Sequence, residues 1–403
     1  MREWFRYVFA GRPAWMNVLM AFSAYMAFVY VPWDIFIKPA AVDEEVWFGV
    51  RFHGGWAKFL ALFHWIVYAA GAYGFRHMKA WMWPWASIYV GQVAFSMLVW
   101  PMLYAGGFLG FLFGLFSFIP FAFLTLVLWN AKDTFEEESA PLRERYGEWA
   151  LVTGASAGIG AEFARVLARD GMSVVLTARR EERLHELAAE LESRHGVETR
   201  VVVADLAKRE DIERVASAVD GLDLAMLVNN AGYGYSGSFA KQDGERLRDM
   251  VLLNCVAPVQ LTSLLLPGML ARVGRSAVVL TGSVAGRQPL PLHAVYSATK
   301  AFDLLFGEAL AVELRDQGVD VVVLEPGPTA TEFQQQAGEI AHAGQPVDEV
   351  VESAFDALGR QPSVVAGWWN WLRANLASRL LPRSVLAYIA RDFMEAQTPP
   401  EMR

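Results

Sequence analysis

The sequence predicts an α/β protein in which a doubly wound parallel sheet follows an all-α transmembrane domain of about four helices. No Asp, Glu, Lys or Arg lies between Lys79 and Lys132, and this stretch is far longer than the roughly 20 residues that cross a bilayer once. From Trp149 onward, short β-branched runs alternate with amphipathic stretches, which is the pattern of βαβ units. The chain has 403 residues, 54% hydrophobic and 19% charged, and this composition excludes a disordered protein.

The first 131 residues contain four apolar stretches, at about 13–37, 56–75, 80–104 and 107–129, which we expect to cross the membrane. Short loops rich in Lys and Arg stay in the cytoplasm. Such residues precede the first stretch, lie between the second and third, and follow the fourth: Arg2, Arg6, Arg12, Arg76, Lys79, Lys132, Arg143 and Arg145. The sequence therefore predicts a multi-pass integral membrane protein with both termini and the second half cytoplasmic. The predicted transmembrane domain is 1–131, and 132–148 is a connector.

Charge and residue counts exclude several kinds of site and partner. Residues 1–131 have a net charge of +3, which leaves −11 for the remainder and argues against nucleic acid as a partner. The single cysteine, Cys255, excludes an intrachain disulfide and a Cys-rich metal site. His53, His64 and His77 lack a ligand spacing such as H-E-x-x-H, so we expect packed or interfacial histidines and no metal site.

Six β-branched runs are the expected strands of the second half: 150–153, 173–178, 199–204, 224–229, 276–281 and 319–325. Candidate helices at 159–169 and 181–194 lie between them. The first strand leads into a glycine-rich loop, Thr153-Gly154-Ala155-Ser156-Ala157-Gly158-Ile159-Gly160. Glycine allows a pyrophosphate to approach the backbone amides, and the helix N-terminus carries partial positive charge. This pattern predicts a Rossmann-type dinucleotide-binding domain that holds its cofactor through Gly154, Ser156, Gly158, Ile159 and Gly160.

Further motifs follow in a fixed order along the chain. Asn229-Asn230-Ala231-Gly232 ends the fourth strand, Asn254 lies on the next helix, Ser283 follows the fifth strand, and Tyr296-x-x-x-Lys300 lies on the helix after it. In this order and at these separations, the set resembles the short-chain dehydrogenase/reductase family over about 149–366. The resemblance implies an oxidoreductase acting on an alcohol or carbonyl, with Asn254, Ser283, Tyr296 and Lys300 as its catalytic residues.

The Tyr–Lys pair explains how such a site works. Residues four apart share one face of a helix, so the Lys300 ammonium can lie close to the Tyr296 phenol. We expect this cation to lower the pKa of Tyr296 from its usual value of about 10 and so make it the general acid/base. Ser283 would bind the substrate oxygen. The resemblance implies that Lys300 also binds the nicotinamide ribose and that Asn254 anchors a water that relays the proton.

The end of the second strand indicates which nicotinamide cofactor is bound. NAD enzymes of this architecture carry an acid there for the ribose hydroxyls, whereas this chain has Ala178 followed by Arg179 and Arg180. The planar donor fork of arginine suits a 2′-phosphate, so we predict NADP(H); the alternative is that both arginines begin a solvated helix. Many family members have a basic residue where this chain has Ala157. The resemblance adds further cofactor contacts: Asp205, Asn230, Ala231, Gly232, Tyr296, Pro326, Gly327, Thr329 and Thr331.

The remaining segments bear on the substrate. Residues 331–346 are polar and lie where the family usually has a mobile lid. Residues 367–403 interleave aromatic and aliphatic side chains with arginines, including Trp368, Trp369, Trp371, Arg373, Arg379 and Arg383. Two interpretations stay open: a helix in an anionic membrane surface, or helices packed on the sheet or on the spans. A domain tied to a bilayer can take a substrate dissolved in it, so we expect a lipophilic ketone, aldehyde or alcohol, such as a long-chain 3-oxo lipid, a sphingoid-type compound, a sterol or a retinoid.

The overall plan is similar to membrane-anchored lipid carbonyl reductases of this family, with more spans than they usually have. Two other functions remain as alternatives: an accessory subunit of a transport or lipid-binding module, and a redox sensor that binds nucleotide without turnover. Charge pairs within the membrane would favour the first, but 80–131 has none; a broken catalytic set would favour the second, but all four residues are present. A working oxidoreductase therefore ranks first. The resemblance allows a homodimer or homotetramer that pairs through the helices carrying Asn254 and Tyr296.

Overall fold

The computed structural model describes residues 14–76, 78–79, 81–132, 135, 140–341, 343–377 and 382–403. The chain forms two compact units, Met1–Ala140 and Pro141–Arg403. Of the residues used in the sequence predictions, Arg2, Arg6, Arg12, His77 and Arg379 lie outside the described ranges.

The first unit is built mainly of helices, as predicted. Its main helical stretches are α2 (Ala14–Tyr25) continued by η1 (Met26–Tyr30) and α3 (Val31–Phe36), then α4 (Gly55–Arg76), α5 (Met82–Tyr104) and α6 (Gly107–Trp129). Between α3 and α4 the chain forms a short helix, η2 (Ala40–Val42), and an antiparallel hairpin of β1 (Glu44–Trp47) and β2 (Val50–His53). This hairpin was not predicted, because its strands are only four residues long.

Four helices in the described part of the chain are long and apolar enough to cross a membrane. Three belong to the first unit, at Trp15–Phe36, Met82–Tyr104 and Gly107–Trp129. The expected second span, α4, is not among them. The fourth is Gly244–Ala271 of the second unit, which packs one apolar side, with Leu261, Leu265 and Met269, on the sheet.

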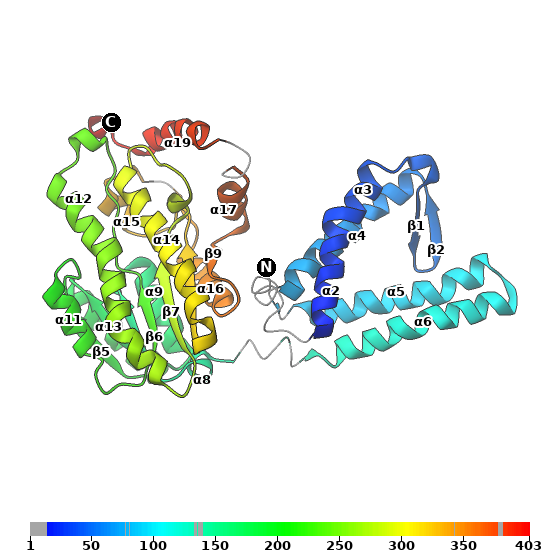
Figure 1. The fold of residues 1–403 in the computed structure, drawn as a ribbon, viewed down its shortest axis with the longest axis horizontal. Helices are drawn as coiled ribbons and strands as arrows, with labels where there is room; N and C mark the ends of the chain where they lie inside the picture. The colour runs from blue at the N-terminus through cyan, green and yellow to red at the C-terminus, as the bar shows by residue number, and fades with distance from the viewer. Residues whose placement is uncertain are drawn as a thin grey trace. The chain divides into compact units, whose positions relative to one another are not determined.

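Helices α5 and α6 pack closely along their length (Figure 1). A Cβ at Gly110 would lie 2.6 Å from the carbonyl oxygen of Pro101, and one at Gly114 would lie 2.5 Å from that of Leu98. Only glycine at these two positions lets the backbones approach so closely. Small residues four apart are typical of helix contacts in membranes, where close packing replaces the hydrophobic effect.

The second unit contains a seven-stranded parallel sheet in the order β5-β4-β3-β6-β7-β8-β9. Its strands are β3 (Trp149–Thr153), β4 (Ser173–Ala178), β5 (Thr199–Val203), β6 (Leu224–Asn229), β7 (Ser276–Thr281), β8 (Val319–Glu325) and β9 (Ser363–Val365). The first six confirm the predicted strands to within a residue. The order reverses between β3 and β6, so the crevice for a ligand lies at the carboxyl ends of these strands.

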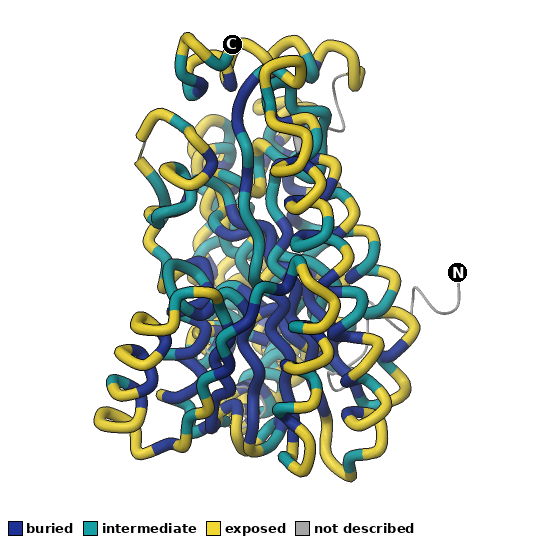
Figure 2. Tube along the Cα trace, turned by 90° about the vertical axis from the view of Figure 1, so that its left-hand side faces the viewer, coloured by how far each residue is buried: buried dark blue, intermediate teal, exposed yellow. Residues whose placement is uncertain are grey.

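Helices cover both faces of the sheet. One face carries α9 (Gly158–Arg169), α10 (Glu181–His195) and α16 (Val347–Ala357); the other carries α11 (Arg209–Ser217), α13 (Ala257–Ala271) and α14 (Ala294–Leu314). Figure 2 shows the buried centre of this unit, where the sheet lies, and the exposed outer sides of the surrounding helices. Because both faces are covered, neighbouring strand residues such as Leu151 and Val152 are both fully buried.

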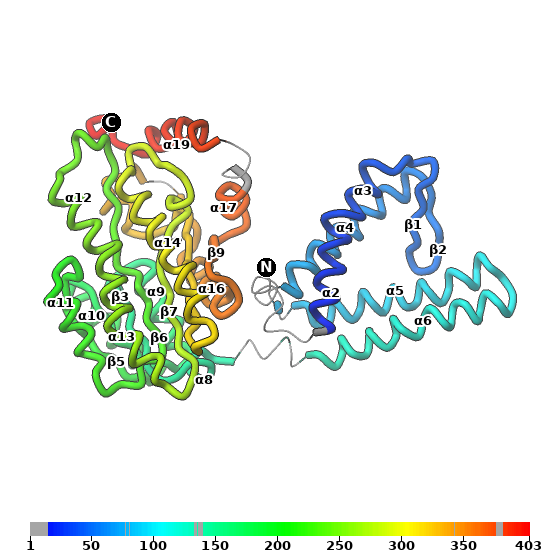
Figure 3. Tube along the Cα trace, viewed as in Figure 1, coloured from blue at the N-terminus to red at the C-terminus, as the bar shows by residue number. Residues whose placement is uncertain are grey.

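The C-terminal segment packs on the second unit. It forms α17 (Trp368–Leu372), η8 (Arg373–Ala377), α19 (Arg383–Gln397) and η9 (Pro400–Met402). Figure 3 shows α19 and the C-terminus at the same end of the unit as α12 (Gly244–Val251). The amide of Ile340 donates to the carbonyl of Gln397 at 2.8 Å, and that of Ser238 donates to Met402 at 2.6 Å. These bonds join α19 and the end of the chain to the predicted lid and to the loop after β6.

Candidate active site

A pocket of about 630 Å³ lies at the carboxyl ends of the strands. Every predicted cofactor residue lines it except Gly160, which lies behind the loop. Of the predicted catalytic residues, Ser283, Tyr296 and Lys300 line the pocket, whereas Asn254 lines a small neighbouring cavity. The tertiary structure thus brings together residues that are spread over much of the second unit.

The loop between β3 and α9 has the shape that an anion requires. Gly158 has a φ of +55°, which other residues rarely adopt, and a Cβ at Gly160 would lie 2.3 Å from the carbonyl oxygen of Gly154. Helix α9 begins at Gly158, and its N-cap residue, Ala157, provides no side-chain cap. The N–H groups of its first turn are therefore left for a phosphate group, and the residues present fit a dinucleotide pyrophosphate.

Thr153 organises the strand ends beneath this loop. Its Oγ1 accepts hydrogen bonds from the backbone N–H groups of Asn230 at 2.8 Å and Ala231 at 3.0 Å. The Asn230 side chain returns a bond from Nδ2 to the Thr153 carbonyl at 3.0 Å. These bonds hold the ends of β3 and β6 together. This role of Thr153 was not predicted, although its place as the last strand residue before the first loop glycine was a usable signal.

The two arginines after β4 have different partners. The Arg180 guanidinium donates to Ser156 Oγ at 3.1 Å and to Glu332 at 2.8 Å, and Glu332 also pairs with Arg183 at 2.6 Å. Arg179 is exposed, lines the pocket and makes no hydrogen bond or ion pair with another residue in the described ranges. Arg179 is therefore the arginine that remains available to a 2′-phosphate.

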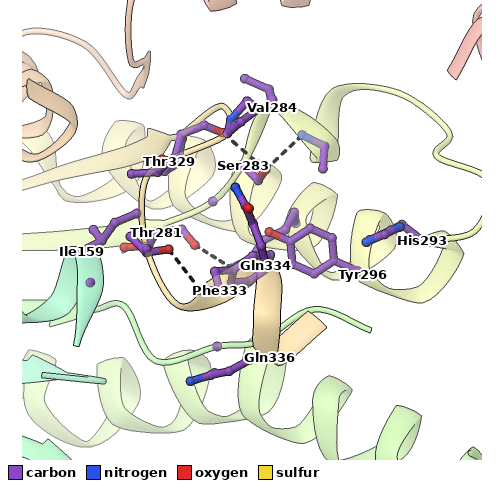
Figure 4. A pocket seen from close by; sticks show the side chains of 18 of the residues that line it. Ile159, Thr281, Ser283, Val284, His293, Tyr296, Thr329, Phe333, Gln334 and Gln336 are labelled. Carbon is purple, nitrogen blue, oxygen red and sulfur yellow. Dashed lines mark hydrogen bonds between the residues drawn. The ribbon is translucent and has the colours of Figure 1, made fainter. Parts of the chain in front are cut away.

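Ser283 and Tyr296 come from neighbouring elements. Ser283 follows β7 and caps η6 (Val284–Arg287): its Oγ accepts from the Ala285 amide at 3.1 Å and donates to the Pro326 carbonyl at 3.4 Å. Tyr296 lies in the first turn of α14. Figure 4 shows Tyr296 between His293 on one side and Ser283 and Gln334 on the other. Two polar groups thus face the pocket where a substrate oxygen could bind.

The pKa of Tyr296 differs from the sequence prediction. Burial raises this pKa, and the Lys300 ammonium and the Ser283 hydroxyl, which lower it, do not outweigh the burial. The carboxylates of Glu339 and Asp303 raise it further. The expected lowering by Lys300 is therefore wrong as a net effect, because spacing along a helix reveals the neighbouring cation but not the loss of solvent.

Lys300 and Asn254 lie behind Tyr296. Lys300 Nζ donates to the Thr281 carbonyl at 2.7 Å and to Asp303 Oδ2 at 3.0 Å. Asn254 lies on a π-helix, η5 (Leu252–Val256), and its Nδ2 donates to the Tyr233 carbonyl and to Thr299 Oγ1, both at 3.0 Å. Such π-turns inserted in α-helices are frequent at functional sites.

A small cavity connects these two side chains. Its volume is about 10 Å³, close to what a single water requires, and Asn254, Lys300 and Asp303 line it. The predicted water relay through Asn254 stays a prediction, and this cavity is the place for it.

The pocket has an apolar wall that was not predicted from the sequence. Its side chains come from the loop after η6, from α15 (Phe333–Ala337) in the predicted lid and from α19, and they are Leu290, Phe333, Leu386, Ile389, Ala390, Phe393 and Met394. Leu386, Ala390 and Met394 are buried and four residues apart, so they share one face of α19. This spacing was the signal in the sequence, but it does not tell which surface the face meets.

The comparisons with known proteins agree with this geometry. The family profile described as short chain dehydrogenase matches residues 148–341. A very-long-chain 3-oxoacyl-CoA reductase of Anas platyrhynchos is 35% identical over 241 residues, which cover 57% of this chain and 77% of the relative. The chain belongs to the short-chain dehydrogenase/reductase family. A second relative, a 7beta-hydroxysteroid dehydrogenase of Collinsella aerofaciens, is 35% identical over 57% of this chain and 89% of its own length.

Solved structures of the family share the fold of the second unit. A 7beta-hydroxysteroid dehydrogenase has a TM-score of 0.58 and 32% identity, covering 62% of this chain and 99% of its own. A short-chain dehydrogenase of Sphingobium yanoikuyae in complex with NADPH has a TM-score of 0.52 and 34% identity, covering 58% and 96%. The match to a very-long-chain 3-oxoacyl-CoA reductase of Phaeosphaeria nodorum, 36% identical, spans 64% of that relative. The predicted family, Rossmann-type fold and oxidoreductase class are confirmed.

Proposed function

We propose that this protein is a membrane-bound, NADP(H)-dependent reductase of lipophilic ketones, with long-chain 3-oxoacyl lipids as its substrates. The observation that carries this proposal is the apolar wall that α19 and Phe333 add to the pocket containing Tyr296. A wall of this kind suits a hydrocarbon chain, because burying each methylene group contributes about 0.8 kcal/mol. The names of the relatives in Anas platyrhynchos and Phaeosphaeria nodorum support the 3-oxoacyl class.

The residues of the pocket fit NADP(H), the cofactor found in the Sphingobium yanoikuyae relative. The first turn of α9 would hold the pyrophosphate, Arg179 the 2′-phosphate, and Asp205 the adenine. Lys300 would bind the nicotinamide ribose, and the 326–331 loop would lie beside the nicotinamide. When bound, NADPH supplies the hydride that the carbonyl carbon receives.

Two residues of the chain bind the carbonyl oxygen, and one of them supplies its proton. Ser283 Oγ and the Tyr296 hydroxyl bind the oxygen, and Tyr296 donates a proton to it as the carbonyl becomes an alcohol. Because burial raises the pKa of Tyr296, the phenol is protonated at neutral pH and ready to donate. This protonation state suits the reduction step, which takes up a proton at the carbonyl oxygen.

The first unit supplies the membrane attachment in this proposal. We assign four crossings to α2–α3, α4, α5 and α6, with both termini in the cytoplasm, because the loops rich in Lys and Arg then share one side. The long apolar helices at Trp15–Phe36, Met82–Tyr104 and Gly107–Trp129 and the close α5–α6 contact support three of these crossings. The crossing by α4 rests on its 22-residue length and on the placement of the basic loops. A substrate dissolved in the bilayer is then available to the attached catalytic unit.

Self-association through α13 and α14 also belongs to the proposal. Both helices expose large apolar side chains: Leu264 on α13, and Leu305 and Val312 on α14. Burial of such side chains against a second copy is the expected use of exposed apolar surface. Mass measurement of the detergent-solubilised protein would give the number of chains.

The proposal is tested with the full chain in lipid nanodiscs. NADPH oxidation is followed with 3-oxoacyl-CoA substrates of graded chain length, with Tyr296→Phe as the blank and NADH for comparison. Turnover that grows with chain length, prefers NADPH and is lost in the variant supports the proposal. Polycyclic ketones form a second panel, because the similarity to the 7beta-hydroxysteroid dehydrogenases favours them as the second candidate. Binding of NADPH without turnover of either panel would instead favour the sensor or accessory function.

A further inference from the structure

Helix α14 carries a third buried ionisable residue, Asp303, beside the catalytic Tyr296 and Lys300. Asp303 follows Lys300 by three residues, and both are almost fully buried, at 3% and 5% exposure. Asp303 Oδ2 lies 3.0 Å from Lys300 Nζ. The other oxygen, Oδ1, is buried and accepts no hydrogen bond from the residues that the structure describes. A carboxylate left half-satisfied in this way costs free energy, so folding alone does not explain it.

Asp303 is the acidic group that acts on Lys300. Burial raises the pKa of its carboxyl, and the Lys300 ammonium, which lowers that pKa, favours the charged form. The ionisable groups that influence Lys300 are Asp303 and Tyr296 on its own helix and Cys255 on η5. Burial raises the pKa of Cys255 to about 11 and also raises that of Tyr296, so both are neutral at neutral pH. The remaining partner of the ammonium is the Thr281 carbonyl at 2.7 Å. A carbonyl dipole does not neutralise a buried charge, whereas a carboxylate does.

We propose that Asp303 is a positioning residue of the active site: its carboxylate keeps the buried Lys300 protonated and holds Nζ at the Thr281 carbonyl behind Tyr296. This inference rests on the proposed function, because it gives Lys300 its charge for use beside Tyr296 and the cofactor ribose. Without the carboxylate, burial favours the neutral amine. Lys300 then loses its proton within the working pH range.

A test without cofactor or substrate measures how stability depends on pH. The wild type and the Asp303→Asn variant are prepared as full chains in detergent. Their apparent unfolding temperatures are recorded from about pH 6 to about pH 9.5, across the range where a buried lysine titrates. In the variant, the pKa of folded Lys300 falls below its unfolded value of about 10.4, so the folded state binds fewer protons in that window. Stability then rises with pH relative to the wild type. The amount by which the variant's unfolding temperature lies below that of the wild type, its stability deficit, should shrink by about half or more between neutral and alkaline pH.

The chain offers a matched control in Asp320→Asn. Asp320 is also buried, at 7% exposure, and its Oδ2 lies 3.1 Å from Arg275 Nε. It accepts a further bond from the Tyr146 hydroxyl at 3.0 Å. Arginine stays protonated at every pH used, so the deficit of this variant should not change with pH. A deficit of Asp303→Asn that is equally constant, or that grows with pH, would overturn the proposal.

Two further measurements complete the test. NADPH-dependent reduction by Asp303→Asn should decline about tenfold for each pH unit above the new Lys300 pKa, where the wild type stays flat, and Asp303→Glu should restore the flat profile. If Asp303→Asn does not fold, the double variant Asp303→Asn/Lys300→Met removes both charges and should fold; failure of the double variant would show a packing role only. The stability measurements need no turnover, so their result stands even if the proposed substrate is wrong.

Discussion

Arg180 joins the end of β4 to the predicted lid: its Nη1 lies 2.8 Å from Oε2 of Glu332, a residue 152 positions later in the chain. The same carboxylate binds Arg183 at 2.6 Å. The two arginines hold the pKa of Glu332 below its usual range, so it stays charged at neutral pH. A bound 2′-phosphate would therefore compete with Glu332 for Arg180, whereas Arg179 needs no such exchange.

This difference predicts separate roles for the two arginines. Arg179→Ala should weaken NADPH binding by about 10- to 100-fold, because a hydrogen bond to a charged group contributes about 1.5–3 kcal/mol. NADH binding should be unchanged, since NADH lacks the 2′-phosphate. Fluorescence titration of both nucleotides measures this directly. An equal loss for both would show that Arg179 does not recognise the phosphate.

The lid contact predicts a gain of binding in Glu332→Gln. The neutral amide releases Arg180 to the nucleotide, so NADPH affinity should rise by a factor of about 3 to 10, equivalent to roughly 1 kcal/mol. The same titration with NADH is the control and should not change. Weaker binding of NADPH would mean that closure of the lid matters more than the freed arginine.

Tyr296 predicts opposite pH behaviour in the two directions. Reduction needs the phenol and oxidation needs the phenolate; since burial raises the pKa of Tyr296, oxidation should accelerate with rising pH while reduction stays flat through neutral pH. Tyr296→Phe should lower kcat about 10²- to 10⁴-fold in both directions and weaken NADPH binding far less, because only the hydroxyl is removed. Steady-state rates between pH 6 and 10 provide the comparison. Oxidation that does not depend on pH would assign the proton transfer to another group.

The wall formed by α19 predicts control of chain length. Ala390 is 5% exposed and lines the pocket, so Ala390→Trp should fill the space a long chain needs. We expect kcat/KM to fall more than about tenfold for the longest substrates, because they lose two or more methylene contacts. For the shortest substrates kcat/KM should change little. Tyr388→Trp on the exposed side of the same helix is the control. If both variants show the same dependence of kcat/KM on chain length as the wild type, α19 does not contact the substrate.

The proposed topology predicts which loops face away from the cytoplasm. An N-glycosylation acceptor inserted in the β1–β2 turn at 48–49 should be modified in a eukaryotic membrane preparation, whereas one inserted near Ala140 should not. Mobility on gels with and without deglycosylation distinguishes the two. Modification at both sites would contradict an even number of crossings.

The sequence by itself determined the local features of this protein. Runs of β-branched residues predicted β3 to β8 to within a residue, because each strand is buried on both faces and is therefore continuously apolar. The glycine loop and the Tyr296–Lys300 pair could also be recognised from the sequence, because a tight turn and a shared helix face depend on residues close in the chain. These patterns were enough to predict the family and the fold.

Only the tertiary structure decided the features that depend on distant contacts and on burial. The helix at Gly244–Ala271 is as long and apolar as a membrane span, and its packing on the sheet is visible only in the folded unit. Nothing in the spacing showed that α19 would line the pocket, that Glu332 would bind Arg180, or that the pKa of Tyr296 would rise. A residue's type and neighbours in sequence determine which interactions it can make, whereas the loss of solvent and the approach of remote charges arise only when the whole unit is folded.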